Sequence, residues 1–204
     1  MKIFAKYLIA LFIFSACKEA EKVKIVIDNP LVSDIEVRIE DTILKIPAEG
    51  MQELELAVGE HQFETKLEQS TLKGSFSVEK EGLLNATGSE YVLWKELFLS
   101  QEVTPEEGEA IYVSVLKEDS IVLEGVKYFG EFTKYGKDKY FIPKTWEFNT
   151  ITNFPEKPSM NARYETKKKI FRKMPFIHEY EERYAFDEKE TKRIYDSILK
   201  EIHK

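Results

Sequence analysis

Apolar and polar residues alternate with a period of two from Lys22 to Val78, and this pattern constrains the fold more than any other feature of the sequence. Successive side chains of a β-strand point to opposite faces, so such alternation is typical of strands that bury one face. The segments that show it are 22–27, 35–39, 53–56, 62–66 and 71–78, and a turn is expected over 58–61. Short strands at a spacing of about 8–12 residues predict an antiparallel β-sandwich, to which we assign residues 23–99.

The aromatic content rises sharply after residue 89. Phe63 and Phe76 are the only aromatic residues between positions 22 and 89, whereas positions 90–186 hold nineteen. Segment 104–108 has the composition of a boundary loop, and segment 90–98 fits either side of that boundary. We predict a second, aromatic-rich β unit over residues 109–204. Its expected strands are 111–115 and 120–123, followed by a hairpin formed by 130–135 and 139–142.

Two helices are expected after these strands. The first begins near Pro175, because proline is favoured in the first turn of a helix, and extends to Tyr184. The second follows Asp187, which can cap it, and carries an apolar stripe at helical spacing: Ile194, Tyr195, Ile198, Leu199 and Ile202. The expected fold class is therefore mainly β, an N-terminal antiparallel β-sandwich followed by an aromatic-rich β unit with C-terminal helices.

The first sixteen residues have the order of a secretory signal peptide. A basic start is followed by the apolar run 7–14 and by two small residues before Cys17. The run is too short to span a bilayer, which needs roughly 20 apolar residues. We assign residues 1–16 to the signal peptide and residues 17–22 to a tether, which holds the folded part close to its membrane.

Two resemblances to known families add to this reading. Phe14-Ser15-Ala16-Cys17 resembles the lipobox of bacterial lipoproteins of the Bacteroidetes type, although Phe14 stands where Leu, Val or Ile is usual. The resemblance implies that Cys17 is acylated and anchors the protein in the outer membrane of the cell envelope, with the body periplasmic or surface-facing. Segments 46–50 and 56–63 resemble the Pro-Gly-bounded hairpins of PEGA-like and immunoglobulin-like envelope modules, which are mostly non-catalytic spacers or binding units.

The charge of the chain excludes one class of partner. It has 30 basic and 37 acidic residues, a net charge of −7. Loss of Lys2 and Lys6 with the signal peptide leaves 28 basic residues against 37 acidic ones, a net charge of −9. Binding to nucleic acid needs a basic surface, so we expect no nucleic-acid partner.

Candidate sites in the body of the protein are few. His61, His178 and His203 are too scattered for a metal site, and we predict no metal and no cofactor. The aromatic residues of the second unit either fill its core or form an exposed face that binds a ligand. Tyr135 and Trp146 adjoin turns or polar residues, so they are the first candidates for exposed ligand contacts. The basic run 166–173 would suit an anionic lipid surface or would simply be a solvated edge.

A tripeptide pattern points to a modification. Asp41-Thr42-Ile43, Asp119-Ser120-Ile121 and Asp196-Ser197-Ile198 each resemble the Asp-Ser/Thr-aliphatic signal for O-glycosylation of exported Bacteroidetes proteins. The resemblance implies glycan on Thr42 and Ser120, whereas Ser197 lies within the second expected helix.

These features together predict a membrane-anchored, non-catalytic binding or structural module of the cell envelope. Its expected partners are the membrane, through acyl chains on Cys17, and another envelope protein or a glycan. Two alternatives stay open. One is a protective inhibitor that neutralises a secreted toxin, since an acidic surface suits a basic partner. The other is a hydrolase that uses two carboxylates across a cleft.

Overall fold

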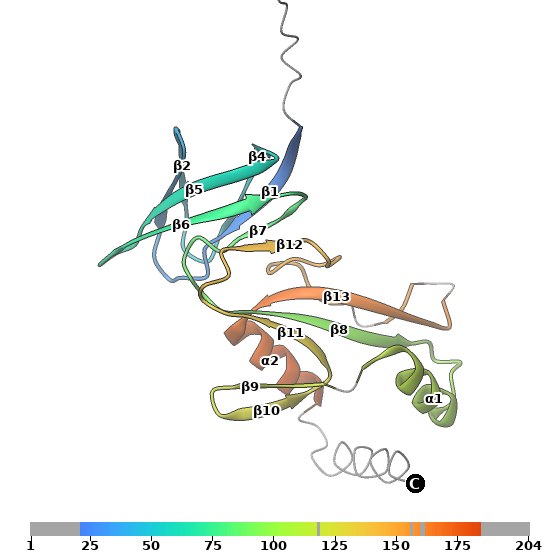
Figure 1. Cartoon of the computed structure of the whole chain (residues 1–204). Coiled ribbons are helices and arrows are strands. Elements are labelled where there is room, and N and C mark those ends of the chain that lie inside the picture. The colour runs from blue at the N-terminus through green and yellow to red at the C-terminus, as the bar shows by residue number, and fades with distance from the viewer. Residues whose placement is uncertain (1–20, 118, 156, 160–161, 185–204) are drawn as a thin grey trace, which may run out of the picture.

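The computed structural model describes residues 21–117, 119–155, 157–159 and 162–184, and it shows a mainly β protein, as expected (Figure 1). The predicted signal peptide, Cys17 and the helix expected after Asp187 lie outside the described residues. The elements are β1 (Lys22–Asp28), β2 (Ile35–Ile39), β3 (Thr42–Ile46), β4 (Met51–Ala57), β5 (Gly59–Lys66), β6 (Thr71–Val78), β7 (Gly82–Leu84), β8 (Tyr91–Leu99), α1 (Pro105–Val115), β9 (Ser120–Leu123), β10 (Val126–Phe129), β11 (Glu131–Tyr135), β12 (Phe141–Pro143), β13 (Tyr164–Arg172) and α2 (Lys173–Tyr184).

The first unit is a sandwich of two four-stranded sheets, in the orders β12-β7-β1-β4 and β3-β2-β5-β6. The five alternating segments of the sequence form β1, β2, β4, β5 and β6, and their apolar faces meet between the sheets. All pairings in these sheets are antiparallel except that of β1 with β7, which is parallel. The buried core between the sheets consists of Ile25, Ile27, Ile35, Val37, Ile39, Ile46, Leu56, Phe63, Phe76, Val78, Leu84, Ala86 and Phe141.

The second unit is built around β8, which is the central strand of the sheet β11-β8-β13. The boundary that we placed after residue 99 was therefore wrong, because β8 opens the second unit instead of closing the sandwich. β9 and β10 form a separate two-stranded hairpin, and α2 packs on the sheet. α1 lies beside the end of β8 (Figure 1). Gly108 of α1 approaches the side chain of Leu99 there.

Two local expectations in this unit were also wrong. Residues 111–115 belong to helix α1, because Thr104 and Glu107 form a reciprocal capping box and Pro105 occupies the first turn. Segments 130–135 and 139–142 do not pair as a hairpin. Instead β11 pairs with β8, and β12 crosses back to pair with β7 of the sandwich. The helix expected from Pro175 to Tyr184 is confirmed as α2.

A buried ion pair joins the two units. Arg172, at the end of β13, donates to both carboxylate oxygens of Asp28, from Nη2 to Oδ1 (2.7 Å) and from Nε to Oδ2 (3.0 Å). The hydroxyls of Tyr91 (2.8 Å) and Thr150 (3.1 Å) also donate to this carboxylate, and Arg172 reaches the carbonyl oxygen of Glu49 (2.9 Å). Asp28 is fully buried, so these contacts fix the end of β1 to β8 and β13.

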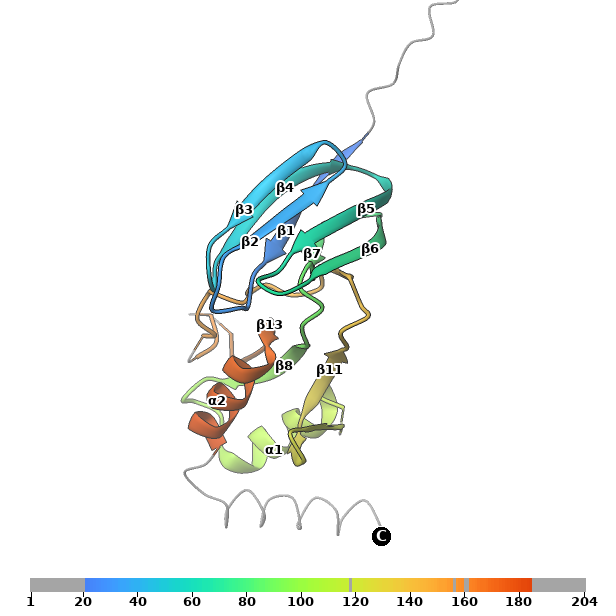
Figure 2. The same ribbon diagram turned by 90° about the vertical axis from the view of Figure 1, so that its left-hand side faces the viewer.

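The two units stand end to end (Figures 1 and 2). The start of β1 lies at the pole of the sandwich away from the second unit, and α1 and α2 lie towards the opposite end. The N-terminal end of β1 and the helices of the second unit are therefore at opposite ends of the part of the molecule that the structure describes.

Candidate functional site: the Trp94 cluster

Alternation along β8 puts an acidic residue on an otherwise apolar face. Val92, Trp94, Glu96 and Phe98 point to the same side of the sheet, and all four are buried. α2 covers this side. With residues of β9–β11, β13 and the loop around Phe154, these side chains form what we call the Trp94 cluster. Its apolar members are Val92, Trp94, Phe98, Leu123, Tyr128, Phe132, Phe154, Phe171, Phe176 and Ile177, edged by Tyr180 and Tyr184, and its charged members are the buried Glu96 and Lys169.

Trp94 is the centre of an aromatic assembly. Six rings have their centroids 5.4–6.0 Å from the indole: Phe132, Phe154, Phe171, Phe176, Tyr180 and Tyr184. The rings of Phe154 and Phe176 meet the indole edge to face, at interplanar angles of 63° and 81°. Such pairs contribute beyond the area they bury, so this assembly is a large part of what holds α2 to the sheet.

Two cations pack against these rings. The guanidinium of Arg183 lies 5.1 Å from the centroid of Phe154 and 5.8 Å from that of Trp94, and its Nε donates to Oε1 of Glu179 (2.7 Å). The ammonium of Lys169 lies 4.1 Å from the ring centroid of Phe171. Burial lowers the pKa of Lys169, because its surroundings disfavour the charged form. The rings offset part of this cost through cation–π attraction.

Glu96 is the buried acid of the cluster. The hydroxyl of Tyr184 donates to Oε2 (2.6 Å) and the amide of Leu97 donates to Oε1 (3.0 Å). Burial raises the pKa of Glu96, while the hydrogen bonds from Tyr184 and Leu97 oppose the shift. Burial, and then the charge of Glu96, raise the pKa of Tyr184 well above its usual value. Because both oxygens of Glu96 already accept hydrogen bonds from the protein, its carboxyl fixes the end of α2 to the middle of β8.

The sequence analysis missed the charged members of the cluster, although a signal for them exists. Glu96 falls in phase with Trp94 and Phe98 in the alternation of 91–99, and Lys169 falls in phase with Phe171 in 164–172. A charged residue in phase with aromatic ones on a strand indicates a buried charge.

The aromatic residues that we selected as ligand contacts are not brought together on an exposed face. Trp146 is 7% exposed and packs with Leu83, Tyr91, Leu93, Ile142 and Ile170, so its expected exposure was wrong. The reason is that the segment after β12 folds back over the opposite face of the second sheet. Tyr135 is half-buried against the same residues, and burial raises its pKa.

The two candidate glycosylation sites lie at hairpins. Thr42 is exposed at the start of β3, directly after the β2–β3 turn in which Glu40 has a positive φ of 52°. Ser120 is half-buried at the start of β9, and its amide donates to Oδ1 of the exposed Asp119 (2.7 Å). Thr42 is therefore the more accessible of the two hydroxyls. Ser197 lies outside the described residues.

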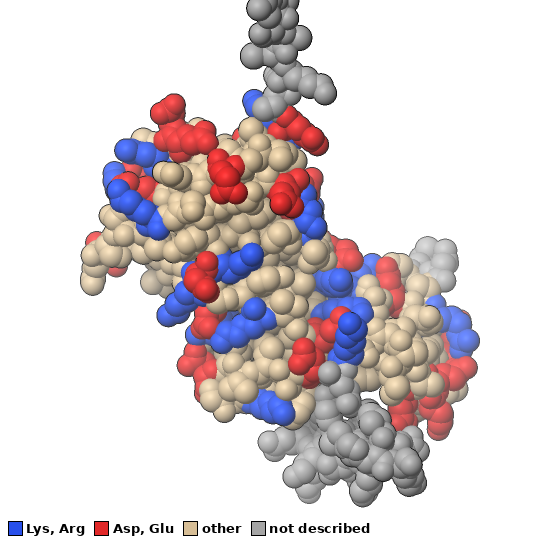
Figure 3. Space-filling model, viewed as in Figure 1, with Lys and Arg blue, Asp and Glu red and all other residues tan. Residues whose placement is uncertain are grey.

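The side chains of the basic run 166–173 lie on both faces of the second sheet. Most of it forms β13, so Lys167 and Lys169 point to the α2 side and Lys168 to the other. Lys167 pairs with Glu165, and Lys173 pairs with Glu90 (2.9 Å). On the face that Figure 3 shows, basic and acidic side chains are interspersed over both units. The run therefore does not form one continuous basic surface.

His61, which we expected in a turn, is buried on β5. Its Nδ1 lies 2.7 Å from Oε1 of Glu40 and its Nε2 lies 2.7 Å from the carbonyl oxygen of Ala57. In the part of the chain that the structure describes, no group of three or more His, Cys, Asp or Glu side chains could hold a metal ion. The helices within that part are too short or too polar to cross a membrane.

In comparisons with known proteins, no family model, no curated protein and no solved structure matches this chain. The molecule itself defines its class, a mainly β protein in which a two-sheet sandwich is joined to an aromatic-rich three-stranded sheet.

Proposed function

We propose that the protein is a membrane-anchored lipoprotein of the bacterial cell envelope and acts as a non-catalytic binding or structural module. Acyl chains on Cys17 would hold it at the outer membrane. In this proposal the sandwich is a spacer, and the second unit contacts another envelope protein or a glycan.

The observation that carries the proposal is the position of β1. This strand starts at the pole of the sandwich away from the second unit (Figures 1 and 2). A tether of residues 17–22 attached there is short, roughly 20 Å when extended, so the sandwich lies next to the membrane. The buried pair Asp28–Arg172 joins the units, so the second unit is held at the far end.

The Trp94 cluster supports a non-catalytic role. Catalysis by a carboxylate needs an oxygen directed at a substrate, but both oxygens of Glu96 accept hydrogen bonds from Tyr184 and Leu97. The cluster is the hydrophobic core that holds α2 against the sheet β11-β8-β13.

Protease treatment of intact and lysed cells tests the location, with Cys17→Ala as the control that removes the anchor. We expect the wild-type protein to remain with the membrane fraction and the Cys17→Ala variant to be released from it. Degradation in intact cells would indicate a surface-facing body, and degradation only after lysis a periplasmic one. A wild-type protein that is found in the soluble fraction after lysis, as the Cys17→Ala variant is, would overturn the proposal.

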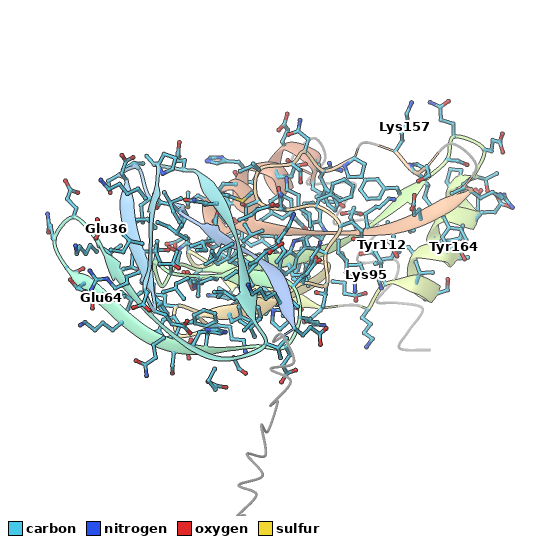
Figure 4. The ribbon with its side chains drawn as sticks, turned by 90° about the horizontal axis from the view of Figure 1, so that it is seen from above. Glu36, Glu64, Lys95, Tyr112, Lys157 and Tyr164 are labelled. Carbon is cyan, nitrogen blue, oxygen red and sulfur yellow. The ribbon has the colours of Figure 1, made fainter. Side chains whose placement is uncertain are left out.

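Photo-crosslinking in cells tests which unit makes the contact. The reactive side chain is placed at Tyr164, which is 47% exposed in the second unit, or at Ile43, which is 50% exposed on the sandwich. Tyr164 lies far from Glu36 and Glu64 of the sandwich (Figure 4), so the two positions report on different ends of the molecule. We expect a defined adduct from position 164. An adduct from position 43 alone would contradict the assignment of the sandwich as spacer.

A further inference from the structure

Lys169 is a buried cation without a hydrogen-bonded counter-ion. It pairs with Trp94 of β8, so its side chain points to the α2 side of the sheet, and it is 6% exposed. Its ammonium lies 4.1 Å from the ring centroid of Phe171. In the part of the chain that the structure describes, no oxygen accepts a hydrogen bond from this ammonium. Lysine is almost never buried unless it is paired, so a lysine in this state is unusual.

The nitrogen of Lys169 is accessible although its stem is enclosed. Among the described residues, the fully enclosed side-chain atoms that have no hydrogen-bond partner are Oγ1 of Thr65 and Oγ of Ser100, and Nζ of Lys169 is not one of them. The aromatic rings therefore cover the methylene stem while the nitrogen reaches solvent. A ligand can meet this ammonium without breaking a hydrogen bond within the protein.

A second cation with unused donors lies close to this lysine. The guanidinium of Arg183 lies 5.1 Å from the ring centroid of Phe154, and that ring is 5.8 Å from the one that Lys169 contacts. Nε of Arg183 donates to Oε1 of Glu179 (2.7 Å), and Nη2 donates to the carbonyl oxygen of Pro155 (3.3 Å). Nη1 donates to no described residue, so its hydrogens are left for another acceptor.

The charges around these two cations do not balance. Burial is the main reason that the pKa of Lys169 is lowered; the charge of Glu179 opposes this shift and the charge of Arg183 adds to it. Glu179 is therefore near both cations, and it is already paired with Arg183. Lys167, the next residue on this face of β13, pairs with Glu165 and adds no net charge. Two cations and one carboxylate leave one positive charge in excess, which a monoanion would neutralise.

We infer that Lys169 and Arg183 form a binding site for the carboxylate group of a small organic acid. A carboxylate carries a single negative charge, whereas a phosphate monoester carries about −1.5 to −2 at pH 7 and would reverse the excess. The two oxygens of a carboxylate can accept from Nη1 of Arg183 and from Nζ of Lys169, and both hydrogen bonds are charge-assisted. This site does not depend on the proposed location in the cell envelope.

Protection of Lys169 from acylation tests the inference on the full mature chain with Cys17→Ser, which removes its only thiol. The protein is treated with N-hydroxysuccinimidyl acetate in sodium acetate, glucuronate, phosphate or chloride at equal ionic strength, and each lysine is followed by peptide mass spectrometry. An opposite charge nearby raises the pKa of an amine by roughly 1–3, so a saturating carboxylate should slow the acylation of Lys169 at least tenfold relative to chloride. Lys168 points to the other face of β13 and is the internal control, whose rate should not change.

Equal rates for Lys169 in the carboxylates and in chloride would overturn the inference. Equal slowing of Lys168 would show a general effect of the salt and would overturn it too. A stronger effect of phosphate than of either carboxylate would assign the site to phosphate and overturn the carboxylate. A stronger effect of glucuronate than of acetate would support the site and identify the ligand as a sugar acid, and the reverse order would support it with a simple aliphatic acid.

Urea unfolding gives an independent measurement. A ligand that binds only the folded state raises the folding equilibrium constant by the factor 1 + [L]/Kd, which is about tenfold at ten times Kd. The wild type should show this gain in the carboxylate that protects Lys169, and Lys169→Met, which keeps an apolar stem on the rings, should not. Arg183→Gln should lose the gain as well, whereas Arg163→Gln should retain it, because Arg163 is exposed and pairs with Glu107. A gain in Lys169→Met as large as that of the wild type would overturn the inference.

Discussion

Replacing Arg172 by methionine should destabilise the protein more than any surface substitution. Among the described residues, the change leaves the fully buried carboxylate of Asp28 with side-chain hydrogen bonds from Tyr91 and Thr150, and it removes two charge-assisted bonds of 2.7 and 3.0 Å. Breaking a buried ion pair by removing one partner costs about 3–5 kcal/mol. For a chain of 150–250 residues, each kcal/mol lowers Tm by about 2–4 °C, so the expected fall is about 6–20 °C.

Urea unfolding followed by tryptophan fluorescence measures this loss, since Trp94 and Trp146 are both buried and report on the second unit. Arg163→Met is the matched control, because Arg163 is exposed and pairs with the exposed Glu107, so its replacement should change the free energy of unfolding little. The double variant Asp28→Leu, Arg172→Met should recover part of the stability, since no buried charge is left unpaired. A loss for Arg172→Met no larger than that of Arg163→Met would refute the reasoning.

Three further predictions concern single groups. Burial raises the pKa of Glu96, so the wild-type protein should lose stability relative to Glu96→Gln as pH rises from about 4 to 7 in urea unfolding series. Hydrogen bonds from Lys173 and Lys134 lower the pKa of Glu90 to about 2. Glu90→Gln should therefore destabilise the protein fully above pH 4.5 and not at all below about pH 2, in the same unfolding series. Thr104→Ala removes the cap of α1 and should cost about 1 kcal/mol, measured as faster hydrogen exchange of the α1 amides.

Each of these predictions has a clear contrary result. A difference between the wild type and Glu96→Gln that is constant across the pH range would show that Glu96 keeps an ordinary pKa in the folded state. Destabilisation by Glu90→Gln that persists at pH 2 would mean that the ion pairs with Lys134 and Lys173 are not its cause. Thr104→Ser keeps the hydroxyl, so exchange in α1 as fast as in Thr104→Ala would exclude the cap as the reason.

The strands of the sandwich were predictable because one face of each is buried and the other is in water, which imposes alternation on the sequence. β7 was not predictable in this way. All three of its residues, Gly82, Leu83 and Leu84, are buried, so it lacks a polar face, and it is short. The composition of residues 111–115 is typical of a strand. These residues are helical because α1 begins at the cap formed by Thr104 and extends through them to Val115.

The position of β8 and the members of the Trp94 cluster depend on pairing over long distances. Tyr91 and Arg172 are neighbours only because β13 pairs with β8 along nine residues, and no local pattern encodes that register. Trp146 illustrates the same limit. Its neighbours in sequence are polar, but the residues that bury it, Leu83 and Ile170 among them, come from other parts of the chain.

The return of β12 to the sandwich has a consequence for the order in which the protein can fold. β7 pairs with β12, the amide of Asn85 donates to the carbonyl oxygen of Tyr140 (2.7 Å), and Phe141 stacks on Phe76 in the sandwich core. A fragment ending at Leu99 would lack all three contacts. A chain synthesised from its N-terminus therefore cannot complete the sandwich until β12, which follows β8 and β11 of the second unit, has been synthesised. The two units therefore complete their folding together.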